Sequence, residues 1–180
     1  DGFDDDLFIE SIPAARKSVH IQKGAPSLVV VVMESARGDV IGKRIDGKPV
    51  APNLEALAAT GSLAVPNYSH VGFTTSSLKS MFTGRLEPRV GDASLFSDLK
   101  SSGYRIGVLS GQPEDFGDIS TVLQMRRSAD VYVDAEILKD KRAFGFAAKG
   151  SLLVDEKFLL EAFDRNFGAK ENWSQPTFLY

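Results

Sequence analysis

The candidate nucleophile is Thr74, the first of four consecutive hydroxyl-bearing residues at 74–77. They precede a segment that ends at Gly84 and carries apolar residues at helical spacing: Leu78, Met81 and Phe82. Ser and Thr are preferred at helix starts and Gly at helix ends, so the pattern predicts a helix that begins near Thr75 and buries those three apolar residues. The free N–H groups and the dipole of its first turn would favour an anionic ester next to Thr74. The alternative is an ordinary surface helix capped by Ser or Thr.

Two neighbours of Thr74 are further candidates for the site. We expect Ser77, together with Thr75, to cap and support the helix start, and Ser77 could also contact a substrate. His70 lies four residues before Thr74 and could act as a general base or bind the substrate. A lone histidine beside a turn is more often structural, so both interpretations of His70 stay open.

A carboxylate, Glu34, follows directly after the continuous apolar run of residues 28–33. Such a β-branched run is typical of a strand that is buried on both faces of a parallel sheet. Ligands of open α/β sheets bind at the carboxyl ends of the strands, where Glu34 would lie. A charge beside a buried run is costly unless it is hydrated, paired or bound to a metal. Glu34 is therefore a candidate metal ligand, and the alternative is a salt bridge to Arg37.

The rest of the chain alternates between strand-like and helix-like segments. Helices are predicted over residues 52–61, 94–102, 119–125 and 153–167, and strands over residues 104–109, 131–133 and 176–180. This order predicts an α/β fold, namely a mainly parallel sheet with helices on both faces. We expect the strands at residues 27–33 and 104–109 to be central in that sheet.

The chain divides into a short N-terminal part and one α/β domain. We expect residues 1–26 to be an approach segment whose acidic cluster, residues 4–6, is solvated, and residues 27–180 to be the N-terminal portion of the domain. Because a strand-like run reaches Tyr180 without a following turn, we expect the natural polypeptide to continue.

Composition excludes several classes of function. The net charge is −3 and no basic block occurs, which argues against a nucleic-acid partner. The absence of cysteine excludes disulfides, thiolate zinc sites and a cysteine nucleophile. The longest apolar run, residues 27–33, is far shorter than the roughly 20 residues of a membrane span. Membrane contact is therefore expected only through segments outside this chain.

Four stretches, in this order and spacing, resemble the sulfatase branch of the alkaline phosphatase superfamily. They are Val-Val-Met-Glu-Ser-Ala-Arg-Gly-Asp at 31–39, Ala-Pro-Asn-Leu-Glu-Ala-Leu-Ala at 51–58, Phe-Thr-Gly-Arg at 82–85 and Gly-Tyr-Arg at 103–105. The resemblance covers roughly residues 27–109 and is looser up to Tyr180. It implies that Glu34 is a metal ligand and that Thr74, ten residues before Gly84, is the nucleophile. If one ion touches both side chains, their oxygens should lie within about 5 Å of each other.

The chain departs from the sulfatase pattern at two motifs, and both departures argue against sulfate ester hydrolysis. Sulfatases carry Cys/Ser-x-Pro-Ser-Arg at the nucleophile, whereas residues 74–78 read Thr-Thr-Ser-Ser-Leu. The family's Gly-Lys-Trp after the Gly-Tyr strand is replaced by Ser-Gly-Gln at 110–112, which removes a lysine used at the sulfate. The chain instead resembles the membrane-anchored branch, which contains phosphoethanolamine transferases and lipoteichoic-acid-synthase-like phosphoglycerol transferases.

The resemblance implies metal-dependent phosphoryl or phosphodiester transfer through Thr74. Glu34 and Thr74 would bind a divalent ion (Zn, Mn, Mg or Ca), and the substrate would be a small-molecule or lipid-headgroup phosphodiester. The expected location is extracytoplasmic, in the periplasm or at the cell envelope. The family's other ligands, an Asp-His pair and further His or Asp residues, have no match in this chain, so we expect these 180 residues alone to be inactive. The alternatives are a sulfuric ester hydrolase and a non-catalytic α/β binding module.

Overall fold

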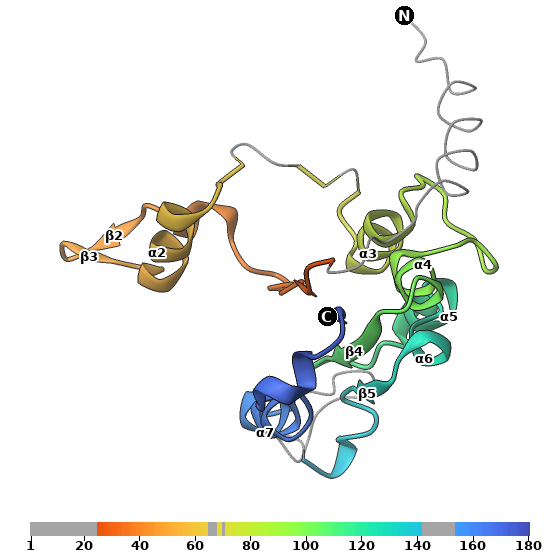
Figure 1. The fold of residues 1–180 in the computed structure, drawn as a ribbon. Coiled ribbons are helices and arrows are strands. Elements are labelled where there is room, and N and C mark those ends of the chain that lie inside the picture. The colour runs from red at the N-terminus through yellow and green to blue at the C-terminus, as the bar shows by residue number, and fades with distance from the viewer. Residues whose placement is uncertain (1–24, 65–67, 70, 142–153) are drawn as a thin grey trace, which may run out of the picture.

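A four-stranded parallel sheet organises the protein (Figure 1). The computed structural model describes residues 25–64, 68–69, 71–141 and 154–180. Across the sheet the order of strands is β1 (Leu28–Val29), β6 (Thr177–Leu179), β4 (Arg105–Leu109) and β5 (Val131–Val133). Every neighbouring pair is parallel. The predicted α/β fold with a mainly parallel sheet is therefore confirmed.

One face of the sheet is covered by four helices, which are α3 (Thr74–Thr83), α4 (Leu95–Ser101), α5 (Ile119–Val122) and α6 (Met125–Ser128). Successive side chains of a strand point to opposite faces, and Ile106, Val108 and Phe178 point to this one. Their partners are buried residues of the helices: Leu78, Phe82, Phe96, Leu99, Ile119, Leu123 and Met125. This face holds the main hydrophobic core.

The opposite face packs against α7 (Glu156–Phe167), which lies within the helix predicted over residues 153–167. Gly107 of β4 faces this helix, and a Cβ built on it would lie 2.4 Å from Cζ of Phe167 and 2.8 Å from Cδ1 of Leu179. Cβ atoms do not approach other heavy atoms so closely, so only glycine fits between the sheet and the helix.

Replacing Gly107 with alanine is expected to destabilise the protein by about 1–3 kcal/mol, because overpacking forces the ring of Phe167 or the strand to shift. The free energy of unfolding from chemical denaturation measures the effect. Gly38→Ala is the matched control, since its Cβ would meet nothing within 4 Å. Equal stability of the two variants would contradict the close packing of α7 on β4.

A small excursion between β1 and α3 lies apart from the sheet (Figure 1). It contains η1 (Gly38–Val40), a hairpin of β2 (Arg44–Ile45) and β3 (Lys48–Pro49), and α2 (Pro52–Thr60). The hairpin turns at Asp46 and Gly47, both with positive φ, as a two-residue hairpin turn requires. The predicted helix at residues 52–61 is present, but none of its residues is buried.

The prediction of a central, buried strand at residues 27–33 is wrong. β1 spans only two residues, and among the described strands it pairs with β6 alone. Val31 and Met33 are 79% and 56% exposed, and Val32 is exposed as well. A strand is buried on both faces only when strands flank it and helices cover it, and the described part of the chain supplies neither on the outer side of β1. The buried central strands are β6 and β4.

The structure also differs from the sequence-based predictions in details of two helices. Met81 is 56% exposed, whereas Leu78 and Phe82 of the same helix are buried as expected. The predicted helix at residues 119–125 is divided into α5 and α6, because Gln124 takes a left-handed φ of 57°. The approach segment lies outside the described residues apart from Ala25 and Pro26, so the expected solvated acidic cluster stays a prediction.

Candidate active site

Thr74 and Glu34 meet at the start of α3. Forty residues separate them in the sequence, and Oγ1 of Thr74 donates a hydrogen bond of 2.8 Å to Oε1 of Glu34. Thr74 is the first residue of the helix, and Glu34 lies in the loop that leaves β1. The two oxygens are therefore well within the distance that one shared ion would require. The roles of ligand and nucleophile stay predictions.

Among the described residues, the carboxylate of Glu34 is held by hydroxyl groups and not by a cation. Oγ of Ser35 lies 2.8 Å from each carboxylate oxygen, and Ser35 has a left-handed φ of 56°. The hydrogen bonds from Ser35 and Thr74 lower the pKa of Glu34, so the carboxylate is charged at neutral pH. Arg37, the partner considered from the sequence, pairs instead with Asp39 at 2.7 Å. The salt-bridge interpretation of Glu34 is wrong.

The first turn of α3 has no side-chain cap. Phe73 occupies the N-cap position, and the first helical hydrogen bond runs from N–H of Ser77 to C=O of Phe73 at 2.9 Å. The prediction that Thr75 caps the helix is therefore wrong; its side chain lies against Gly117. The N–H groups of this turn remain available to an anion next to Thr74.

Ser77 ties the preceding turn to the helix. Its Oγ lies 2.6 Å from Oγ of Ser69 and donates to C=O of Val71 at 3.1 Å. Ser69 also donates to the same carbonyl at 2.6 Å. This network supports the helix start, as expected of Ser77, while its contact with a substrate stays a prediction. His70 lies outside the described residues.

The side chains at this site are of the type that binds a divalent cation, but they are too few to complete its coordination. A charged carboxylate and two hydroxyls, from Glu34, Thr74 and Ser35, are hard oxygen donors of the type that Mg²⁺, Ca²⁺ and Mn²⁺ prefer and that Zn²⁺ accepts. Zinc takes about four ligands and magnesium or calcium about six or more. Across the described ranges no group of three or more His, Asp or Glu residues could hold a metal. These three oxygen donors alone fall short of a complete coordination shell.

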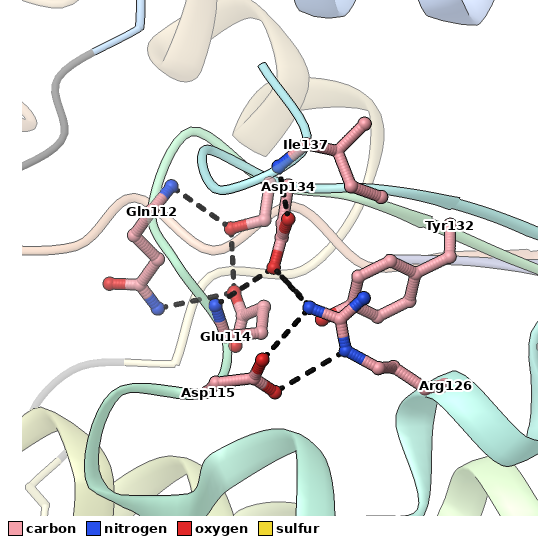
Figure 2. Close-up of polar contacts among 8 residues, drawn as sticks. Gln112, Glu114, Asp115, Arg126, Tyr132, Asp134 and Ile137 are labelled. Carbon is pink, nitrogen blue, oxygen red and sulfur yellow. Dashed lines mark hydrogen bonds and ion pairs between the residues drawn. The ribbon is translucent and has the colours of Figure 1, made fainter. Parts of the chain in front are cut away.

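A second polar cluster, which we did not predict, lies at the carboxyl ends of β4 and β5. It is built around Glu114 and Asp134, both with 0% exposure (Figure 2). Asp134 follows β5 directly, and Glu114 lies in the loop after β4. The sequence signal is the one that singled out Glu34, a carboxylate just after a strand, but nothing in the sequence indicates that these two are buried together.

Comparison with known families gives a match to the sulfatase family over residues 26–180. Comparison with curated proteins found no match, and neither did comparison with solved structures. The helices that the structure describes include none with the length and apolar content of a membrane span.

Proposed function

Because the chain belongs to the sulfatase family, within the alkaline phosphatase superfamily of hydrolases and transferases, we propose that it carries the nucleophile of a metal-dependent phosphodiester transferase. The observation that carries this proposal is the hydrogen bond between Thr74 and Glu34 at the uncapped N-terminus of α3. A hydroxyl, a charged carboxylate and free N–H groups meet there. These are the groups that attack at phosphorus requires.

In the proposed reaction, Oγ1 of Thr74 attacks the phosphorus of a phosphodiester. The new bond joins this oxygen to phosphorus as the hydroxyl gives up its proton, the bond to the leaving alcohol breaks, and the alcohol takes up one proton, so that the protons balance. Glu34 accepts the hydrogen bond of the Thr74 hydroxyl through Oε1, which orients the oxygen for attack. An acceptor hydroxyl or water then cleaves the phosphothreonine and releases the Thr74 hydroxyl.

Sulfatase-family domains are generally metal-dependent, and Glu34 and Thr74 are the residues that would hold the ion. A divalent cation bound there would lower the proton affinity of the threonine hydroxyl and offset the charge on the phosphoryl oxygens. The first-turn N–H groups of α3 would bind the same oxygens from the other side. Of the possible ions, Zn, Mn, Mg and Ca all accept these oxygen donors.

The segment after β4 supports phosphodiester over sulfate as substrate. Gly111 stands where the sulfatase pattern has its lysine, and the flanking side chains of Ser110 and Gln112 both donate to the buried carboxyl of Glu114. Neither can replace a lysine that contacts a charged ester. Sulfuric ester hydrolysis, which the family name favours, is therefore the second candidate, and the same assay tests both.

The substrate class and location belong to the same proposal. We propose a small-molecule or lipid-headgroup phosphodiester as donor, and an extracytoplasmic site of action, in the periplasm or at the cell envelope. The test compares turnover of a model phosphodiester and a model sulfate ester by the full-length protein with added divalent cations. Peptide mass spectrometry then searches the trapped intermediate for a phosphate on Thr74. Turnover of the sulfate ester alone would reject phosphodiester transfer, and turnover of neither would favour a non-catalytic module.

Replacing Glu34 with glutamine removes the only carboxylate that contacts Thr74 among the described residues and keeps its shape. Since loss even of an indirect partner of a metal costs about 10–100-fold in affinity, we expect Mn²⁺ affinity to fall at least 10-fold. Calorimetric titration of the full-length protein measures it. Glu87→Gln, at an exposed glutamate paired with Arg89, is the control. Unchanged affinity in Glu34→Gln would exclude Glu34 as a ligand.

A further inference from the structure

The loop of residues 110–118, which follows β4 and includes η2 (Phe116–Asp118), reaches the first turns of α3. A Cβ built on Gly117 would lie 2.5 Å from Cγ2 of Thr75, so the backbone of Gly117 lies directly against the threonine that follows Thr74. The carbonyl of Gly117 also accepts a hydrogen bond of 3.0 Å from Nζ of Lys79. A displacement of this loop would therefore move or unpack the first turn of α3.

The loop is anchored by the side chain of Glu114, which is fully buried. Its Oε1 accepts three hydrogen bonds, from Ser110 at 2.6 Å, from Gln112 at 3.2 Å and from the Tyr180 hydroxyl at 3.3 Å. Its Oε2 is buried and has no hydrogen-bond partner in the described part of the chain. Oε1 therefore accepts from three donors, whereas Oε2 accepts from none of the described residues.

Asp134 joins the anchor from the end of β5 (Figure 2). Its Oδ2 accepts from the backbone N–H of Glu114 at 3.3 Å, from Tyr132 at 3.0 Å and from Arg126 at 3.3 Å. Its Oδ1 accepts from N–H of Ile137 at 3.0 Å. Arg126 is shared with Asp115 at 2.9 Å, so the cation also holds the residue that follows Glu114.

We propose that Glu114 is a positioning residue, which holds the loop of residues 110–118 against the start of α3 and thereby fixes Thr74 for attack. This inference rests on the proposed function only in the role that it gives to Thr74. The contact between the loop and Thr75 stands without it.

Because Oε2 is buried and has no partner in the described part of the chain, the anchor favours the neutral carboxyl of Glu114 over the charged one. Burial raises the pKa of this carboxyl above its ordinary value, and the nearby charge of Asp134 adds to the effect. The charged groups around it are Asp134, Asp115 and Arg126, and the phenols of Tyr132 and Tyr180 stay protonated donors because burial raises their pKa. The folded state therefore binds the Glu114 proton more tightly than the unfolded chain does. The stabilising effect of the anchor is complete below the pKa that Glu114 has in the unfolded chain. It is lost as pH rises through the higher pKa that Glu114 has in the folded protein.

The experiment follows the methyl group of Thr75 by NMR in the full-length protein labelled at threonine. Its signal is expected to shift with pH, with a midpoint above the ordinary value for glutamate, as the loop loosens. Glu114→Gln, which is neutral at every pH, should abolish this shift, whereas the exposed control Glu136→Gln should keep it. A pH-independent Thr75 signal, or a shift that persists in Glu114→Gln, would overturn the proposal.

Turnover of the model phosphodiester gives the second readout. Across the same pH range kcat should fall roughly 10-fold or more with little change in KM, because small misplacements of reacting groups cost up to about 10²-fold in rate. Glu114→Gln should remove this part of the pH profile. If the Thr75 signal titrates as expected but Thr74→Ala retains activity, the proposed function fails while the coupling of Glu114 to α3 stands. If Thr74→Ala is inactive but kcat of the parent and of Glu114→Gln share one pH profile, the positioning role fails alone.

Discussion

Alanine at position 74 is expected to lower turnover of a phosphodiester by on the order of 10⁴-fold or more, because removal of a nucleophile abolishes the covalent step. The hydrogen bond to Glu34 is lost as well. Stability should change by less than about 1 kcal/mol, since Thr74 is only partly buried and its side-chain hydrogen bond is to an exposed carboxylate. Steady-state turnover and chemical denaturation of the full-length protein measure the two effects.

The controls for Thr74→Ala separate the nucleophile from its neighbours. Thr60→Ala removes an exposed hydroxyl that bonds the C=O of Leu57 in α2, and it should leave turnover unchanged. Thr75→Ala removes the methyl group that lies against Gly117, so a moderate fall in rate and no loss of the phosphorylated residue are expected. Near-normal turnover in Thr74→Ala, or a phosphate found on Thr75 or Ser77, would reject the assignment.

The largest expected effect on stability comes from Phe96, which has 0% exposure at the centre of an aromatic cluster. Its ring centroid lies 5.0 Å from that of Phe82, 5.1 Å from that of Phe178 and 5.8 Å from that of Tyr180. Phe96→Ala should cost about 3–5 kcal/mol, because it removes buried apolar surface, leaves a cavity and breaks these ring contacts. The free energy of unfolding measures it.

The matched control for Phe96 is Phe73→Ala, because this ring is 74% exposed. Its effect on the free energy of unfolding should stay within about 0.5 kcal/mol, as is usual for surface substitutions. A cost below about 1 kcal/mol for Phe96→Ala would contradict the burial of this ring between α4 and the sheet. The rings that Phe96 contacts belong to α3, to β6 and to Tyr180 directly after β6, so this cost reports on how the helices pack on the sheet.

Local signals in the sequence determined the order of elements and the helix ends. Gly84 ends α3 with a φ of 68°, and Ser94 begins α4 with a capping box, as residues of these types do in most contexts. The parallel sheet also followed from the sequence, because strands separated by helices leave few other topologies. Thr74 and Glu34 were singled out by residue type, by their place after a strand or before a helix, and by resemblance to the family.

Only the tertiary structure decided which strand lies at the centre of the sheet and which polar groups are buried. An apolar run such as residues 28–33 predicts a strand but carries no information about its neighbours, and β1 proved to be an edge. The same holds for Glu114, whose burial depends on Asp134 and Tyr180, respectively 20 and 66 residues away. The contact at Thr75 of α3 likewise depends on Gly117, which lies beyond β4 in the sequence. Pairing across such distances depends on how the elements pack. Residue type and local spacing therefore singled out the candidate reacting groups, while packing decided which residues surround them.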